Sequence, residues 1–366
     1  MSREVLEGSV VGPNGGLRCA RVAIEAGRIV EVELGGPGDR DAIIAPGFVD
    51  LQVNGFGGRD AREGAEAIRA ISEQLPRTGV TGFLPTLISR PLEEAPRFVR
   101  AAAEVAAPGA RVLGAHLEGP FLNPAHRGAH EERWLLPPAA GRVAELLERP
   151  PRLVTLAPEL EGGLEAVRAL ACAGVVVSAG HSGATYDEGL AAIDAGVRFA
   201  THLFNAMPPL HHRAPGLVGA VLDDPRVTAG IIADGVHVHQ ALVALAGCAK
   251  GARRLALTTD QVAAAGAPPG HYQLGGRDVT WDGDAVRLAD GTLAGGAATM
   301  DQLVRRAADQ FGLHRALAMA SRTPAGVLGL STLGRVAAGC DADLVVLGPD
   351  LRVRRTLVAG RPVYEA

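Results

Sequence analysis

The chain has 366 residues and a formal net charge of −4, and its 36 basic and 40 acidic side chains are dispersed without a basic cluster, so nucleic acid is not an expected partner. No uncharged apolar run reaches the roughly 18 residues of a membrane span, and the start lacks the apolar stretch of a signal peptide, so we expect a cytoplasmic protein without membrane contact. Lys250 is the only lysine and lies in an apolar, helix-like stretch, which nearly excludes Schiff-base, pyridoxal and carbamylated-lysine chemistry.

The two ends of the chain share a strand-like sequence pattern. Residues 1–45 and 334–366 contain short alternating runs separated by glycine turns, such as Arg28 to Val32 and Ala342 to Leu347. We expect both ends to pair into one small β-sandwich domain. The intervening residues, 46–333, then form the larger domain.

Short runs rich in Val, Ile and Leu alternate with helix-like stretches from Pro46 to about Thr259, a pattern typical of βαβ units. Eight such runs predict an α/β fold, a (β/α)₈ TIM-like barrel. The runs are 47–53, 80–85, 111–117, 152–157, 175–180, 198–201, 228–233 and 254–259.

The segments between and after these runs complete the predicted barrel. Ile68, Ile71 and Leu75 recur at helical spacing, which indicates an amphipathic helix covering the strands. A Gly-rich excursion, 265–296, is typical of an insertion in the last barrel loop. Three helix-like segments then begin at Met300, His314 and Thr323.

Polar side chains follow the predicted strands at the points where they end. In α/β barrels the reacting groups lie on the face formed by these carboxyl ends. Two imidazoles and a carboxylate can hold Zn²⁺ and leave one position open for water. We therefore assign Glu118, His181 and His202 as ligands of a single divalent metal ion. Zn²⁺ is the default, and Fe²⁺, Co²⁺ and Mn²⁺ suit the same ligands.

The remaining strand ends supply a candidate acid and base. Asp260 follows the eighth run, where a carboxylate can take a proton from a metal-activated water and deliver it to a departing amine. The alternative role for Asp260 is a structural cap at the strand exit. Asp234 and His237 follow the seventh run and lie on the same predicted face.

Six segments together resemble the N-acetylglucosamine-6-phosphate deacetylases of the amidohydrolase superfamily over nearly the whole chain. HLFNAMP and LEGPFLNP are the most diagnostic strings within them. The segments are PGFVDLQVNGFGG (46–58), HLEGPFLNPAHRGAH (116–130), AGHSGATY (179–186), FATHLFNAMPPLHHRAPGLVGA (199–220), GIIADGVHV (230–238) and DGTLAGGAATM (290–300).

The resemblance implies roles for further residues. His237 corresponds to a histidine that contacts the acetyl carbonyl, and His130 to one that approaches the sugar. Asn205 and Ala206 match a loop that meets the phosphate, Arg213 matches a phosphate-binding arginine that reaches in from the neighbouring subunit of a homodimer, and Met300 keeps its family position near the substrate.

The first strand also bears on the metal count. It carries Gln52 and Asn54 where two-metal relatives have a His-x-His pair, and amides are poor ligands for transition metals, so one ion is expected. Gln52 is a candidate to orient the water, with barrel packing as its alternative role. Gln261 and Gly296 depart from the family pattern, which has alanine and serine at these places.

The resemblance therefore implies hydrolysis of the acetamide of N-acetylglucosamine 6-phosphate, in amino-sugar catabolism or recycling, without an organic cofactor. The galacto isomer stays open as a substrate. Other amidohydrolase reactions, such as N-acyl-amino-acid hydrolysis or deamination, are also open, although Arg213 and the Asn205 loop disfavour them. A non-catalytic sugar-phosphate-binding barrel is the alternative from another class.

Overall fold

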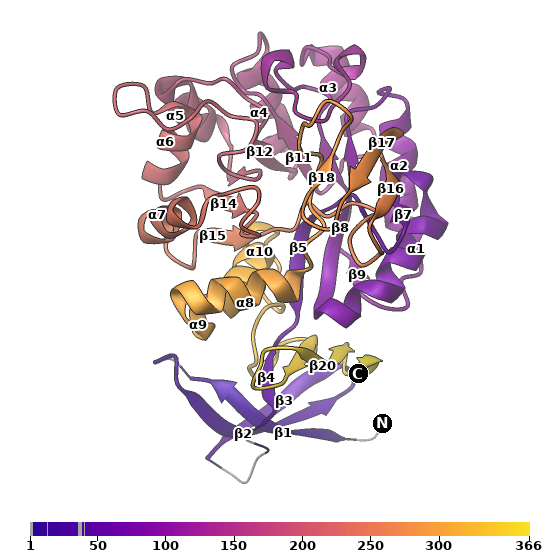
Figure 1. Cartoon of the computed structure of the whole chain (residues 1–366), viewed down its shortest axis with the longest axis vertical. Helices are drawn as coiled ribbons and strands as arrows, with labels where there is room; N and C mark the ends of the chain where they lie inside the picture. Colours follow the sequence, from indigo (N-terminus) through magenta and orange to yellow (C-terminus); the bar gives the residue numbers. More distant parts are fainter. Residues whose placement is uncertain (1–2, 13, 36–38, 40) are drawn as a thin grey trace.

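The computed structural model describes residues 3–12, 14–35, 39 and 41–366. Its larger part is a parallel sheet in the order β15-β14-β13-β12-β11-β10-β8-β5, with β9 beside β8 (Figure 1). All eight predicted runs coincide with strands of this sheet, so the barrel prediction is confirmed. The strands are β5 (Phe48–Val53), β8 (Val80–Ile88), β9 (Arg111–Val112), β10 (His116–Glu118), β11 (Leu153–Leu156), β12 (Val176–Ala179), β13 (Phe199–Ala200), β14 (Thr228–Ile231) and β15 (Leu255–Leu257).

The barrel is nearly closed by polar contacts between its first and last strands. Gln261 forms a parallel bridge with Val53. The carbonyl of Gln261 accepts hydrogen bonds from the backbone N–H groups of Asn54 and Gly55, the two residues that follow Val53. The buried Asp50 accepts hydrogen bonds from the hydroxyls of Thr258 (3.2 Å) and Thr259 (2.5 Å). A carboxylate inside the barrel therefore joins the strand that precedes Asp260 to the first strand.

Helices surround the sheet, as the alternating pattern predicts. Ile68 and Ile71 are fully buried on the first of them, which confirms the predicted apolar stripe, and Leu75 lies in the 3₁₀ turn that follows. No helix in the described part of the chain is long and apolar enough to cross a bilayer. The helices are α1 (Ala65–Gln74), α2 (Glu94–Glu104), α3 (Ala140–Leu147), α4 (Gly163–Cys172), α5 (Tyr186–Ala195), α6 (Gly216–Asp223) and α7 (Gln240–Lys250).

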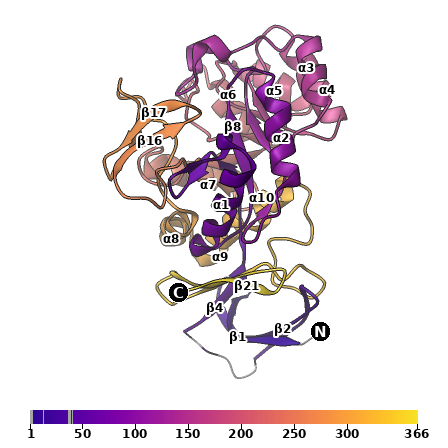
Figure 2. The same cartoon turned by 90° about the vertical axis from the view of Figure 1, so that its right-hand side faces the viewer.

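The chain ends form a separate seven-stranded sheet in the order β21-β20-β19-β4-β1-β2-β3. The linking strand β4 pairs parallel with β1 and antiparallel with β19, and it spans the predicted boundary at residues 45 and 46. The C-terminal strands lie between the N-terminal strands and the barrel (Figure 2). The strands are β1 (Glu4–Val11), β2 (Leu17–Glu25), β3 (Arg28–Leu34), β4 (Ile43–Pro46), β19 (Leu344–Leu347), β20 (Val353–Val358) and β21 (Arg361–Glu365).

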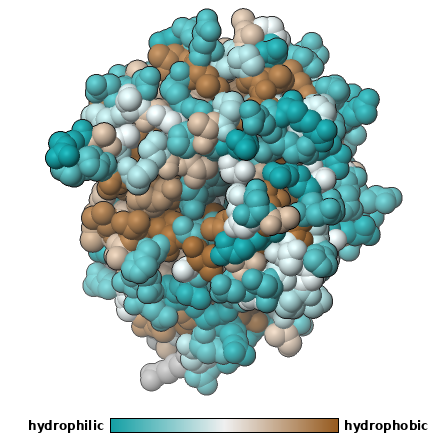
Figure 3. Space-filling view, turned by 45° about the horizontal axis from the view of Figure 1, so that its top comes forward, coloured by the Kyte–Doolittle hydropathy of each residue, from teal (hydrophilic) through white to brown (hydrophobic). Residues whose placement is uncertain are grey.

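The predicted insertion contains more regular structure than the sequence analysis expected. It forms the three-stranded antiparallel sheet β16 (Gly270–Leu274), β17 (Arg277–Trp281) and β18 (Val286–Arg287). Short strands β6 (Gly55–Phe56) and β7 (Arg59–Asp60) pair beside the first barrel strand. The three predicted helices follow as α8 (Met300–Phe311), α9 (Leu313–Ala320) and α10 (Arg322–Val327). Polar residues cover most of the face seen in Figure 3, with apolar residues in patches among them.

Candidate metal centre

Glu118, His181 and His202 meet at the carboxyl end of the barrel. Glu118 is the last residue of β10, and the two histidines follow the ends of β12 and β13. The Oε1 atom of Glu118 lies 3.2 Å from His181 Nε2 and 3.0 Å from His202 Nε2, and the two nitrogens are 3.1 Å apart. All three side chains are buried, and they form a group that could hold a metal ion.

The geometry of this cluster fits a tetrahedral ion. Ligand atoms bound to Zn²⁺ at about 2.0–2.2 Å are separated by about 3.3 Å along the edge of a tetrahedron, close to the three distances in the cluster. His181 Nδ1 donates to the carbonyl of His126 at 2.9 Å, so its Nε2 lone pair faces the cluster. His202 Nδ1 is buried without a hydrogen-bond partner among the described residues.

An unusual backbone conformation places these side chains. His181 and His202 have positive φ angles of 49° and 29°, and Asp260 follows the eighth strand with φ of 48°. Non-glycine residues rarely adopt this region and are found there mainly at sites that the surrounding structure holds in place. The sharp turn after each strand therefore directs the polar side chain into the barrel mouth.

The electrostatics of the cluster favour a cation. Burial opposes ionisation of Glu118, but the adjacent imidazoles of His130, His181 and His202 outweigh it and hold the pKa of the carboxyl well below its usual range. Burial lowers the pKa of His181 to about 4, whereas Glu118 raises the pKa of His202 despite its burial. The cluster therefore presents an ionised carboxylate between imidazoles, a set of ligands that suits a cation.

Two further side chains contact Glu118. Gln52 donates from Nε2 to Glu118 Oε1 at 2.9 Å. Its side chain therefore lies beside one of the three predicted metal ligands. His130 Nδ1 accepts a hydrogen bond from Ser89 N at 3.1 Å and lies 2.9 Å from Ser89 Oγ. Its Nε2 then carries the hydrogen and lies 3.6 Å from Glu118 Oε2. His130 thus faces the cluster, and its predicted contact with the sugar stays a prediction.

Asp260 lies at the same barrel mouth and is only partly buried. Asn54 donates from Nδ2 to Asp260 Oδ1 at 2.7 Å, which leaves Oδ2 without this contact. Burial, followed by the charge of Glu118, raises the pKa of Asp260 to about 7. A cation beside Glu118 would oppose this charge. A carboxyl that can both lose and hold a proton near neutral pH suits a residue that transfers protons.

The two departures from the family pattern lie directly beside this carboxylate. Gln261 is buried, and neither of its amide atoms has a hydrogen-bond partner among the described residues. The backbone N–H of Gly296 donates to the carbonyl of Asp260 at 2.8 Å. A Cβ at position 296 would lie 2.5 Å from the carbonyl oxygen of Thr259, so this backbone excludes serine there.

His237 is held by a carboxylate that precedes it by three residues. His237 Nδ1 lies 2.7 Å from Asp234 Oδ2, and Asp234 Oδ1 accepts the backbone N–H of His237 at 2.9 Å. Because Nδ1 donates to Asp234, Nε2 is an acceptor in the neutral ring and a donor only in the imidazolium. Hydrogen bonds from His237, aided by its charge, lower the pKa of Asp234 despite burial, so the carboxylate can stabilise that cation.

The residues predicted to bind the phosphate are more exposed than the metal cluster. The side chain of Asn205 donates to the carbonyls of His202 and Leu203, while Ala206 adopts a positive φ of 52°. Arg213 is exposed. Met300 is fully buried at the start of α8, so its side chain belongs to the core, and its predicted contact with substrate stays a prediction.

Several contributors to the site were not assigned from the sequence. Ser89 orients His130, the carbonyl of His126 orients His181, and Asp50 fixes the strand before Asp260. A signal existed for Asp50, since it is a charged residue within an apolar run. No sequence signal exists for a backbone carbonyl.

Known proteins resemble this chain in sequence along most of its length. Residues 43–363 match the model of the amidohydrolase family. The chain is 41% identical over 342 residues to an N-acetylglucosamine-6-phosphate deacetylase of Danio rerio, covering 88% of this chain and 84% of that protein. It is 38% identical over 340 residues to an N-acetylgalactosamine-6-phosphate deacetylase of Escherichia coli O157:H7, covering 88% of each.

A solved structure extends the similarity to the whole chain. It is a mutant N-acetyl-D-glucosamine-6-phosphate deacetylase of Mycobacterium smegmatis in complex with N-acetyl-D-glucosamine-6-phosphate. The two proteins are 37% identical, and the match covers 99% of this chain and 100% of the other with a TM-score of 0.93. The predicted fold and family are therefore confirmed.

Proposed function

This chain belongs to the amidohydrolase family, among the N-acetylglucosamine-6-phosphate deacetylases, and from that premise we propose that it hydrolyses N-acetylglucosamine 6-phosphate to glucosamine 6-phosphate and acetate. One observation carries the proposal. A buried Glu118–His181–His202 cluster and the carboxylate of Asp260 share one barrel mouth, in a chain that resembles these enzymes over its whole length.

Glu118, His181 and His202 would hold one divalent metal ion, for which Zn²⁺ is the first choice and Fe²⁺, Co²⁺ and Mn²⁺ are alternatives. When bound, such an ion acidifies a water and polarises a carbonyl oxygen. Gln52 supports the site from the protein side, because its donor fixes the orientation of the Glu118 carboxylate.

Asp260 would move the proton. Asn54 holds Oδ1, so Oδ2 is the atom that can take a proton from the attacking water. The same oxygen then delivers the proton to the amine nitrogen, and the C–N bond breaks to release acetate and the free amine. Burial is the larger cause of the raised pKa of Asp260 and persists when a cation offsets the charge of Glu118, so the carboxyl suits a group that gains and loses a proton in each turnover.

His237 would stabilise the oxygen of the acetyl group as negative charge develops on it. Donation from Nε2 requires the imidazolium, and the carboxylate of Asp234 at 2.7 Å from Nδ1 stabilises that form. Asp234 is therefore proposed to act through His237, as a positioning residue.

Recognition of the phosphate would fall to the Asn205–Ala206 loop and to Arg213. The exposed position of Arg213 supports a contact across the interface of a homodimer, where its fork of donors could pair with two phosphate oxygens. Binding the phosphate far from the acetamide would position the reacting bond.

N-acetylgalactosamine 6-phosphate is the second candidate substrate. It is favoured by the 38% identity to a deacetylase of that sugar, which is similar to the 41% identity to an N-acetylglucosamine-6-phosphate deacetylase. Gln261 also follows Asp260 directly, and its buried amide has no hydrogen-bond partner among the described residues, a departure from the family pattern that bears on which hydroxyl orientation is accepted.

The decisive experiment measures acetate release from metal-loaded protein. The substrates are N-acetylglucosamine 6-phosphate, its galacto isomer and unphosphorylated N-acetylglucosamine, and bound metal is quantified in parallel. The gluco phosphate should react fastest. Preference for the galacto isomer would support the second candidate, and no acetate from any sugar despite about one bound metal would refute both.

A further inference from the structure

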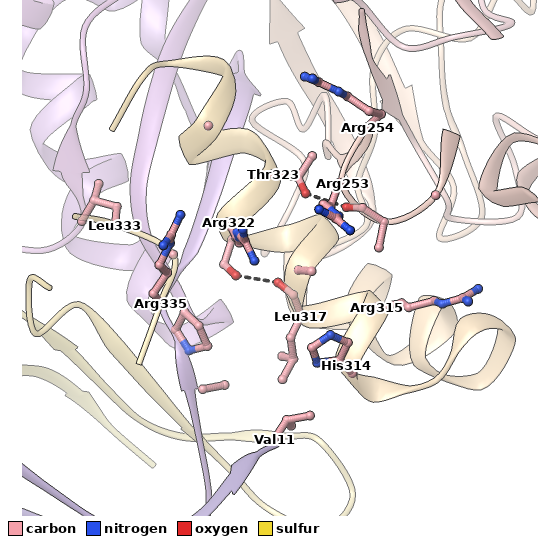
Figure 4. A pocket seen from close by; sticks show the side chains of 18 of the residues that line it. Val11, Arg253, Arg254, His314, Arg315, Leu317, Arg322, Thr323, Leu333 and Arg335 are labelled. Atoms are coloured by element: carbon pink, nitrogen blue, oxygen red, sulfur yellow. Dashed lines mark hydrogen bonds between the residues drawn. The ribbon is translucent and has the colours of Figure 1, made fainter. Parts of the chain in front are cut away.

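A large cavity lies at the opposite end of the barrel, where its amino end faces the small β-domain (Figure 4). Its volume is about 1720 Å³. Val10, Val11 and Leu34 line it from the small domain, and Thr228 at the start of β14 lines it from the barrel. The cavity therefore shares no residue with the candidate metal centre.

The described lining of this cavity carries one sign of charge. It contains eight basic residues and no aspartate or glutamate, although the whole chain has a net charge of −4. Arginines that are dispersed along the sequence are gathered here by the fold, which the sequence analysis did not foresee. The residues are Arg198, Arg226, Lys250, Arg253, Arg254, Arg315, Arg322 and Arg335.

Three of the eight already have partners in the protein. Arg226 forms ion pairs with Asp194 and Asp224, Arg198 donates to two backbone carbonyls, and Lys250 donates to two others. The other five have no carboxylate within 4.0 Å and no side-chain hydrogen bond among the described residues. Like charges repel when gathered in this way, and an anion would relieve the repulsion.

Two contacts bring the central arginines together. Thr323 Oγ1 donates to the carbonyl of Ala252 at 2.6 Å, which ties the residue after Arg322 to the residue before Arg253. Gly334 lies so close to the start of α10 that a Cβ there would be 2.6 Å from the Cα of Arg322.

The same close approach brings the next residue, Arg335, beside Arg322. Figure 4 shows Arg322 on α10, Arg315 on α9 and Arg253 and Arg254 on the chain after α7. Arg254 and Arg315 point away from the other labelled arginines in this view, so Arg253, Arg322 and Arg335 are the exposed cationic side chains that separate elements bring together at the cavity.

We propose that this arginine cavity binds a small anion with several phosphate groups, with Arg253, Arg322 and Arg335 as its central contacts. A guanidinium pairs two phosphate oxygens at once, so several of them suit a chain of phosphates better than one carboxylate. Arg253, Arg322 and Arg335 have no carboxylate within 4.0 Å among the described residues, so the negative charges of a phosphate chain can pair with them. The volume exceeds that of an ordinary small-molecule pocket, about 300–1,000 Å³, so a nucleoside triphosphate also fits.

The test titrates inorganic triphosphate and ATP into the purified full-length protein by calorimetry at two salt concentrations. Both share the phosphate chain, so tighter binding of ATP would identify a nucleotide as the ligand, and equal binding the phosphate chain alone. Affinity should fall as salt rises, since screening weakens exposed charges. The triple variant R253A/R322A/R335A should bind at least tenfold more weakly.

A charge-matched control separates the cavity from net charge. The triple variant R97A/R149A/R361A removes three exposed arginines that do not line the cavity, and it should bind within twofold of the parent protein. Thermal melting gives a second readout, because triphosphate should stabilise the parent and the control but not the cavity variant. This holds whether or not the protein is a deacetylase.

Three outcomes would overturn the proposal. Binding could be equal in the two triple variants, or N-acetylglucosamine 6-phosphate could compete with triphosphate, which would place the anion in the barrel mouth. A single-stranded oligonucleotide could instead bind more tightly than triphosphate and be lost in the cavity variant, which would assign the cavity to nucleic acid.

Discussion

The two ends of the barrel differ in how their charged side chains are arranged. At the carboxyl end, Glu118 and two histidines lie within 3.2 Å of one another, and most of these side chains are oriented by a further hydrogen bond. At the amino end, eight basic residues line a cavity, and five of them have no side-chain partner among the described residues. Fixed neighbours of opposite charge specify a geometry, as a reaction requires. Exposed neighbours of like charge, without partners that orient them, specify only the charge of a ligand.

The largest effect should come from breaking the metal cluster. Glu118→Gln keeps the size of the side chain but removes the charge that two imidazoles face, so metal should be lost and turnover should fall by at least about 10⁴-fold. Elemental analysis and acetate release measure the two losses. Glu93→Gln, an exposed position on the protein surface, is the control. Retained metal with normal turnover would remove Glu118 from the ligand set.

Asp260→Asn should have the next largest effect. The amide can still accept from Asn54 but cannot take a proton, so kcat should fall about 10³-fold, within the range for general acid–base catalysis. Metal content should be unchanged and KM nearly so. If metal is lost together with activity, Asp260 is a ligand and not only a proton carrier.

The pair of Asp234 and His237 tests whether the carboxylate acts through the imidazole. His237→Gln should lower kcat about 100-fold, and Asp234→Asn about tenfold. The double variant should be no slower than His237→Gln alone, because a positioning residue has nothing left to position. Multiplied losses in the double variant would show that Asp234 has an independent role.

The sequence predicts much of the first end and little of the second. The ligands were predicted because each directly follows an apolar run, and parallel strands bring such positions to one mouth. The hairpin of β16 and β17 also had a signal, the two glycines 275 and 276 between alternating runs, both with positive φ. Arg253 and Arg335 are too far apart in sequence for any local pattern to join them.

Lys250 provides a pH-dependent test at the amino end. Burial lowers its pKa from 10.5 to about 8, so the unfolded chain holds this proton more tightly than the folded one. The folded state is therefore penalised below pH 8, and the penalty disappears as pH rises from 8 to 10.5, by up to about 3 kcal/mol. Denaturant unfolding should show the parent gaining stability relative to Lys250→Met over this range. If the difference in unfolding free energy between the two proteins stays constant over this range, burial does not lower the pKa of Lys250.

The smallest effect should come from the arginine cavity itself. Without an added anion, R253A/R322A/R335A should deacetylate within twofold of the parent, since none of the three residues lies at the barrel mouth. The same variant should be at least as stable, because removing like charges removes their repulsion. A large loss of turnover with intact metal content would mean that the two ends are coupled through the barrel. The metal cluster at the carboxyl end and the arginine cavity at the amino end would then not be independent sites.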